Sequence, residues 1–138
     1  MHVGMDLGDG TIVHVEWGGK KRTSYSEWLD VIRLTPVTPL TDAQQASLRQ
    51  LAMTLPVKGY SLGHALRSVL WTSSDDERTT GQRYHCAEFV SYLYRQIGID
   101  LVPNRADDST QPQHFLTSAQ LHETEDTVCT RSAIRRKQ

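Results

Sequence analysis

Two short stretches of the sequence contain residue types that could carry out nucleophilic chemistry. The first, HVGMDLGDGTIVHVEW at residues 2–17, contains His2, His14 and Glu16, and the second, YHCAEFVSYLYRQIG at residues 84–98, contains Cys86. The apolar spacing of the second stretch predicts a helix that begins beside Cys86. Helix N-termini present unpaired N–H groups and a partial positive charge, which favour a thiolate and can stabilise an oxyanion. Cys86 is therefore a candidate nucleophile, although its position alone is equally typical of a small buried structural cysteine.

The register of the hairpin predicted for the first stretch decides where its histidines and glutamate lie. A two-residue loop would bury a histidine and a glutamate among apolar side chains, and burying an unpaired carboxylate costs several kcal/mol. A three-residue loop with Gly10 in the left-handed conformation instead gives one apolar face, made of Val3, Met5, Leu7, Val13, Val15 and Trp17. We therefore predict the three-residue loop, which places His2 directly opposite Glu16, with His14 one pair further along.

A histidine oriented by a carboxylate or by a second histidine is half of a nucleophilic site, and an activated cysteine is the other half. We predict that Cys86 is the nucleophile and His2 the general base. Glu16 is predicted to orient His2, with His14 as the alternate orienting residue. Tyr84, just before the cysteine helix, is predicted to pack as a hydrophobic staple, with substrate binding as the alternative interpretation.

The elements that would position these residues follow from patterning along the chain. We predict two strands around the GDG turn, a short strand and helical turn in KKRTSYSEWLD, and a strand in VIRLTP. A helix is expected over 41–55, with a capping box at its start, and a second over 61–71. The cysteine helix should end at Gly98, followed by loop and one short helix near 116–121. The fold class predicted is α+β, a small antiparallel sheet packed with helices, with a domain at 1–125 and a polar, basic tail at 126–138.

Composition limits the classes of function. The chain has 138 residues, 38% of them hydrophobic, and a formal net charge of -1, which indicates a single globular domain and argues against a nucleic-acid partner. No stretch is apolar enough to span a bilayer, and no signal peptide is evident. The two cysteines lack disulfide or zinc-knuckle spacing, which favours a reduced, cytoplasmic location. A zinc site from His2, His14, His85 and Cys86 is conceivable, but its spacing is not that of a known structural site, so no metal or other cofactor is expected.

Three stretches together resemble the permuted NlpC/P60 group of papain-like cysteine hydrolases, in its YiiX-like branch. They are HVGMDLGDGTIVHVEW, RTSYSEWL and YHCAEFVSYLYRQIGIDL, which together extend over most of residues 2–102. The pattern there is a histidine that opens an HVG strand, an acid near the end of the next strand, an R-T-x-x-x-E-W segment and a helix that begins Y-x-C-x-E. The chain also resembles the lecithin:retinol acyltransferase-like branch, in which the orienting residue is a second histidine twelve positions after the first. His14 stands at that offset from His2 here.

The resemblance implies a circularly permuted papain-like fold and a cysteine peptidase or amidase that uses Cys86, His2 and Glu16. It also suggests that Tyr60 donates to the oxyanion or lines the substrate pocket. The substrate would be a peptide, cell-wall or lipid-derived amide or ester. Two alternatives stay open: a lipid acyltransferase or phospholipase, and a catalytically degenerate binding domain of the same fold.

Overall fold

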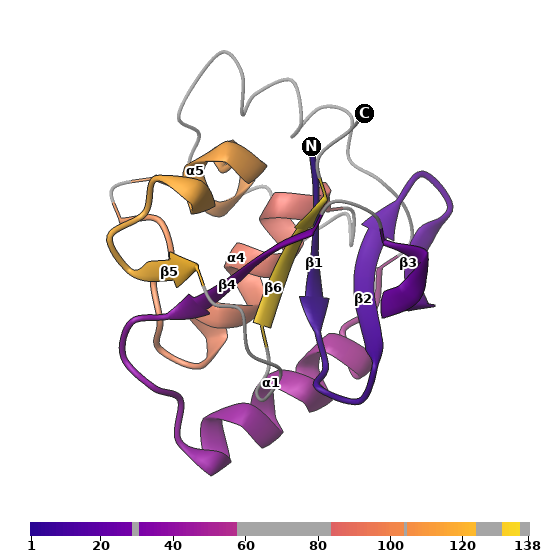
Figure 1. Cartoon of the computed structure of the whole chain (residues 1–138), viewed down its shortest axis with the longest axis horizontal. Helices are drawn as coiled ribbons and strands as arrows, with labels where there is room; N and C mark the ends of the chain where they lie inside the picture. The colour runs from indigo at the N-terminus through magenta and orange to yellow at the C-terminus, as the bar shows by residue number, and fades with distance from the viewer. Residues whose placement is uncertain (29–30, 58–83, 104, 124–130, 136–138) are drawn as a thin grey trace.

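The structure, a computed structural model, describes residues 1–28, 31–57, 84–103 and 105–123 with their side chains, and the backbone of 131–135. It combines one antiparallel sheet with helices that lie on one of its faces (Figure 1). The α+β class expected from the sequence is therefore correct. The helix predicted over 61–71 falls outside the described residues. No helix in the described part of the chain is long and apolar enough to cross a membrane.

Six strands form the sheet, in the order β3-β2-β1-β6-β4-β5, and every neighbouring pair is antiparallel. The N-terminal half of the sheet is a meander, because each of its strands follows the last after a tight turn. The bounds are β1 His2–Asp6, β2 Thr11–Glu16, β3 Gly19–Ser24, β4 Val31–Pro36, β5 Leu121–Glu123 and β6 Arg131–Arg135.

The first hairpin has the predicted three-residue loop. Met5 pairs with Val13, and the backbone N–H of Leu7 donates to the carbonyl of Thr11, so the loop is 8–10. Gly10 has a φ of 87°, the left-handed conformation that this turn requires. The apolar face is buried, except for Trp17, whose exposed fraction is 71%. We expected Trp17 in the core. It is exposed because β2 ends at Glu16, which leaves Trp17 in the two-residue turn before β3.

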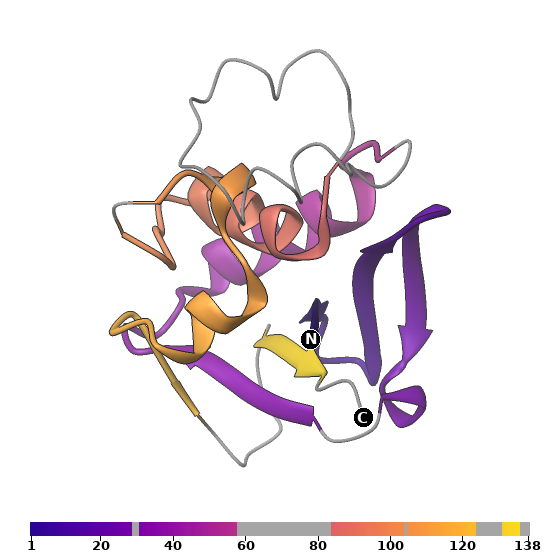
Figure 2. The same ribbon diagram turned by 90° about the horizontal axis from the view of Figure 1, so that it is seen from above.

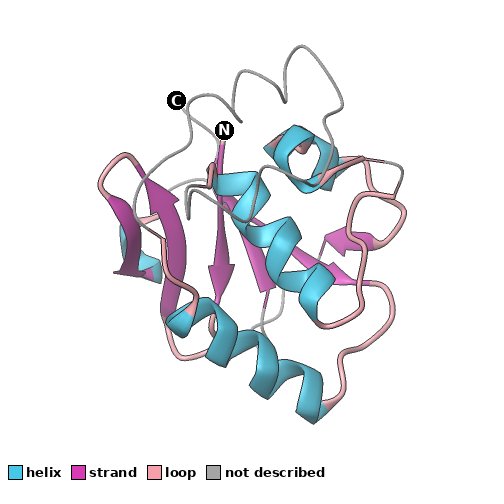
Figure 3. Cartoon of the chain, turned by 180° about the vertical axis from the view of Figure 1, so that it is seen from behind, coloured by secondary structure: helices cyan, strands magenta, loops and turns pink. Residues whose placement is uncertain are grey.

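Two long helices cover the apolar face of the sheet (Figures 2 and 3). Helix α1 (Asp42–Thr54) begins with the predicted capping box between Thr41 and Gln44. Helix α4 (Cys86–Gln96) is followed by Gly98 with a φ of 85°, the predicted end signal. The main core lies between α4 and the strands, and its fully buried members include Val3, Met5, Leu48, Phe89, Leu93 and Tyr94.

Lys20 joins the edge strand β3 to α1. Its Nζ donates to the carbonyls of Met53 and Leu55, both at 2.7 Å, at the C-terminal end of the helix. Lysine is stabilising there because helix C-termini carry unpaired carbonyls and a partial negative charge. This contact holds the β2–β3 hairpin against the helical layer.

The described residues of the C-terminal part include a strand that the sequence did not indicate. Residues 131–135 lie within the stretch that we predicted as a tail, yet they form β6, a central strand between β1 and β4. Two turns of 3-10 helix, η1 (Tyr25–Glu27) and η3 (Asp107–Ser109), and the short α5 (Pro112–Leu116) complete the described elements. Helix α5 ends at Leu116, where the helix expected near 116–121 would begin. The strand β6 was missed because it is held by backbone pairing to strands that are distant in sequence, which a short charged stretch does not reveal.

Candidate active site

His2, His14 and Glu16 form a cluster on the face of the first hairpin opposite the main core. The Nε2 of His2 lies 2.9 Å from the Nδ1 of His14, a hydrogen-bond distance. The same Nδ1 lies 3.5 Å from a carboxylate oxygen of Glu16. Glu16 is also paired with the Nζ of Lys21 at 3.0 Å, and the Lys21 hydrogen bond lowers the pKa of Glu16 against the opposing effect of burial. The predicted cluster is therefore present, and His14 is the residue that is hydrogen-bonded to His2.

Thr23 and Trp28 hold His14 from the other side. The Nε2 of His14 lies 3.2 Å from the hydroxyl of Thr23, which accepts a hydrogen bond of 3.0 Å from the indole N–H of Trp28. The Trp28 ring is stacked on His2, with ring centroids 5.4 Å apart, and meets the edge of His14. Trp28 is buried, as predicted, but it packs with Ile12 in a second, smaller core on this face of the sheet.

Gly4 makes this packing possible. A Cβ at residue 4 would lie 2.5 Å from a methyl group of Ile12, 3.0 Å from the Trp28 ring and 3.2 Å from the Cβ of His14. The first distance is well inside van der Waals contact, so any larger residue would push these side chains apart. Gly4, the glycine of HVG, therefore leaves the space that the Trp28 ring and the Ile12 methyl group occupy.

Cys86 is the first residue of α4 and lies on the core side of the sheet, where its side chain packs in the same cluster as Val3. Burial raises the pKa of the Cys86 thiol above its ordinary value. Backbone hydrogen bonds from Val3, Ala87 and Cys86 itself act in the opposite direction, but they are smaller. We expected the helix N-terminus to lower this pKa. The loss of hydration on burial is the larger effect, so the resting group is a neutral thiol.

His85 caps the cysteine helix. Its Nδ1 accepts from the backbone N–H of Glu88 at 3.3 Å, and the Glu88 carboxylate accepts from the backbone N–H of His85 at 3.2 Å. The other ring nitrogen lies 3.0 Å from the carbonyl of Asp108, which can only accept. These partners require a neutral ring with its proton on Nε2. His85 is therefore part of the support of Cys86, in a buried capping box.

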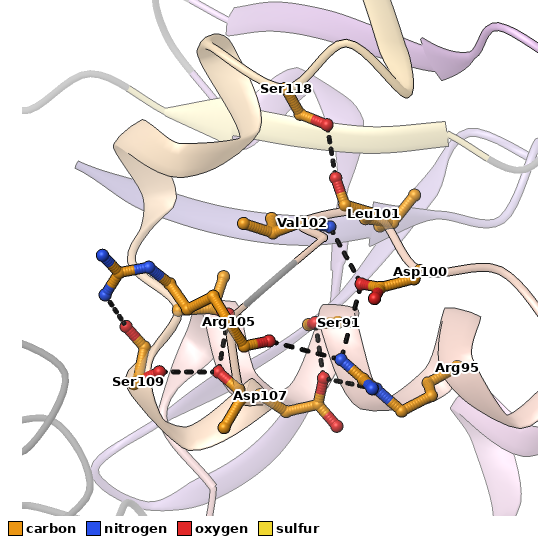
Figure 4. Close-up of polar contacts among 11 residues, drawn as sticks. Ser91, Arg95, Asp100, Leu101, Val102, Arg105, Asp107, Ser109 and Ser118 are labelled. Carbon is orange, nitrogen blue, oxygen red and sulfur yellow. Dashed lines mark hydrogen bonds and ion pairs between the residues drawn. The ribbon is translucent and has the colours of Figure 1, made fainter. Parts of the chain in front are cut away.

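A polar network fixes the segment that supplies the Asp108 carbonyl (Figure 4). The carboxylate of Asp107 is fully buried and accepts from the Ser91 hydroxyl at 2.7 Å and from the Arg95 side chain at 3.1 Å. Arg95 also donates to the carbonyl of Arg105 and to Asp100. Because Ser91 and Arg95 are on α4, the network ties η3 to the same helix that begins at Cys86.

Cys86, at the start of α4, lies against the end of β1 that carries His2. Val3, whose N–H contributes to the surroundings of the thiol, is the next residue after His2. Alternation along the strand turns Val3 toward the main core and His2 toward Trp28. Among the described residues, no hydrogen bond joins the thiol to the His2 ring. Catalytic hydrogen bonds are often long or unaligned in proteins without substrate.

Two predicted site residues remain, Tyr84 and Tyr60. Tyr84 is buried and its ring meets that of Phe89 at 6.4 Å, so the predicted staple between the residue before the cap and the fourth helical residue is confirmed. Tyr60 lies outside the described residues. No role for Gly4, Thr23 or Asp108 is apparent from the sequence, because their contribution depends on contacts between distant segments. The one available signal was the R-T-x-x-x-E-W segment, which contains both Thr23 and Trp28.

Comparisons with protein-family models, with curated proteins and with solved structures find no match for this chain.

Proposed function

We propose that the protein is a cysteine hydrolase with a permuted papain-like fold, in which Cys86 is the nucleophile and His2 the general base. The observation that carries the proposal is the arrangement around β1. A cysteine opens a buried helix and lies against the backbone of Val3, one residue from a histidine that a second histidine orients. This is the pairing of nucleophile, base and orienting group that cysteine catalysis uses. The proposed compartment is the cytoplasm, on the basis of cysteine usage alone.

The reaction would proceed in two steps. The mechanism requires that, when substrate binds, the start of α4 and the end of β1 move together so that the Cys86 thiol reaches His2. Nδ1 of His2 then accepts the thiol proton, while its Nε2–H donates to Nδ1 of His14. The Cys86 thiolate attacks the carbonyl carbon, and the N–H groups at the start of α4 stabilise the oxyanion. The imidazolium then protonates the leaving amine or alkoxide, which leaves a thioester on Cys86. Water, deprotonated by His2, hydrolyses the thioester and restores the thiol.

The hydrogen bond between His2 and His14 supports the lipid acyltransferase or phospholipase as a second candidate. In the lecithin:retinol acyltransferase-like proteins that the sequence resembles, the orienting residue is the second histidine. Here too, His14 is hydrogen-bonded to His2, whereas Glu16 is paired with Lys21 and lies against His14. The substrate would then be a phospholipid ester, with a water or an amine as the acyl acceptor.

Two assays in parallel test the proposal and separate its forms. Release of amine from a mixed peptide amide library would indicate an amidase, and release of fatty acid or N-acyl amine from phosphatidylcholine vesicles with an added amine would indicate the lipid enzyme. We expect Cys86→Ser to abolish either activity and His14→Gln to lower it about 100-fold, with a smaller loss in Glu16→Gln. His122→Gln, at an exposed position on β5, is the matched control. Activity that survives in Cys86→Ser, or turnover in neither assay, would exclude a cysteine hydrolase on these substrates.

A further inference from the structure

The cluster of His2, His14 and Glu16 has the composition and the spacing of a metal site. One donor atom from each of the three residues lies within 4.8 Å of the other two. The distances on His14 Nδ1 are 2.9 Å to His2 Nε2 and 3.5 Å to Glu16 Oε1. Ligands bonded to Zn²⁺ at about 2.0–2.2 Å in tetrahedral geometry are separated by about 3.3 Å. The two distances from His14 bracket this value, and the separation of His2 from Glu16 is at most 4.8 Å, so small rotations of the partly exposed Glu16 side chain would bring the three donors to a metal ion.

We propose that His2, His14 and Glu16 bind a divalent transition-metal ion such as Zn²⁺, through two imidazole nitrogens and one carboxylate oxygen. Two histidines and one carboxylate are a common ligand set for Zn²⁺, and they leave a position for water or another ligand. The ion would replace the hydrogen bond between the two rings. This requires neutral rings with their protons on the far nitrogens, Nδ1 of His2 and Nε2 of His14. With the ion bound, His2 has no free nitrogen to accept a thiol proton, so the metal-bound form and the form in which His2 acts as a base are alternative states of the same cluster.

The groups behind His14 already favour that proton position. Thr23 lies at hydrogen-bond distance from His14 Nε2, and its oxygen can accept from this nitrogen as well as from the Trp28 indole. Histidines that bind metals usually donate their second N–H to such an oxygen, which fixes the ring and directs the other nitrogen at the ion. The stacked Trp28 ring and the glycine beneath it further restrict the positions of both imidazoles.

Lys21 is the group that competes with the metal. Its ammonium lies 3.0 Å from Glu16 and pairs with His14 across the β2–β3 ladder. A cation at the cluster would have to share Glu16 with this charge, so Lys21 lowers the affinity of the site. Removing the charge of Lys21 should therefore strengthen metal binding, whereas changes at Glu16 or Thr23 should weaken it.

Calorimetric titration with Zn²⁺ tests the site in the full chain with both cysteines changed to serine, so that no thiol contributes. We expect one saturable equivalent of Zn²⁺. Glu16→Ala should lower the affinity at least tenfold, Thr23→Val should lower it about 10–100-fold, and Lys21→Gln should raise it. His122→Gln should leave it unchanged. Glu16 and Lys21 have side chains that are 42% and 51% exposed, so these variants should keep the fold.

Three results would overturn the metal site: no saturable binding of one equivalent, equal affinity in the parent and in Glu16→Ala, or a loss in His122→Gln as large as that in Glu16→Ala. The inference does not rest on the proposed hydrolase. Its readout is the affinity of a protein that lacks Cys86, so failure of the metal site and failure of the enzyme are separate outcomes.

Discussion

At the scale of single residues, the arrangement of the histidine-bearing face of the hairpin depends on close contacts between individual side chains. The pattern of the sequence predicted that His2, His14 and Glu16 share a face, because strand alternation and the loop length leave one register with a clean apolar side. It left open which residue orients His2. That depends on side-chain rotamers and on Lys21, which engages Glu16 from the next strand. The role of Gly4 was likewise not predictable, because it depends on an indole contributed from 24 positions further along the chain.

Gly4→Ala should lower the free energy of unfolding by about 1–3 kcal/mol, because the new methyl group would overlap Ile12 and crowd Trp28. Urea unfolding followed by tryptophan fluorescence measures this change. Gly18→Ala is the matched control, since a Cβ there would meet only a Lys21 carbon at 3.8 Å. If the two variants are equally stable, Gly4 does not have the packing role described above.

At the scale of elements, α4 positions Cys86 through its cap and its packing. The sequence predicted the helix, its end at Gly98 and the staple from Tyr84, because each is a local pattern of a few residues. It did not predict that His85 would be the cap or that η3 would hold it. Asp108 is 23 positions from His85, and Asp107 reaches Ser91 and Arg95 only after the chain has turned back on α4. The pKa of Cys86 belongs to this scale too, because it reflects how deeply the start of the helix is buried.

The alkylation of Cys86 by iodoacetamide should therefore have a pH midpoint in the native protein that is higher than in the urea-unfolded chain. Burial raises the thiol pKa in the folded state, and unfolding restores the ordinary value. The same difference stabilises the fold below the unfolded pKa, and this contribution is lost as the pH rises through the folded pKa. Peptide mapping across a pH series gives the midpoint of Cys86 alkylation in the native and in the unfolded protein. The difference between the two midpoints measures the shift in the thiol pKa. A native midpoint below the unfolded one would mean that the helix N-terminus outweighs burial.

At the scale of the whole molecule, β6 joins the two parts of the sheet. It pairs with β1 on one side and β4 on the other, so the first hairpin and the β4–β5 pair meet through it. The α+β class was predictable from the alternation of short strands with amphipathic helices. The order of the strands was not predictable, because pairing with strands that are distant in sequence gives no recognisable pattern in a five-residue stretch such as RSAIR.

Proline at residue 133 should disrupt this central strand. Ala133 pairs with Gly4 on β1 and with Arg33 on β4, and proline has no backbone N–H to donate to either neighbour. We expect Ala133→Pro to abolish cooperative unfolding, or to lower the urea midpoint strongly, in far-UV circular dichroism. Ala133→Ser keeps the backbone donor and should behave like the parent. An unchanged midpoint in Ala133→Pro would show that β6 is dispensable.

The central claim, that His2 activates Cys86, is tested most directly by mapping the acyl-enzyme. The protein is mixed with p-nitrophenyl acetate at neutral pH, and the acetylated peptide is identified by mass spectrometry as p-nitrophenol is released. We predict acetylation of Cys86 that is slowed at least about 100-fold in His2→Ala and is unchanged in Cys129→Ser, which removes the only other cysteine. Equal rates of Cys86 acetylation in the parent and in His2→Ala, or no acetylation of Cys86, would contradict the claim.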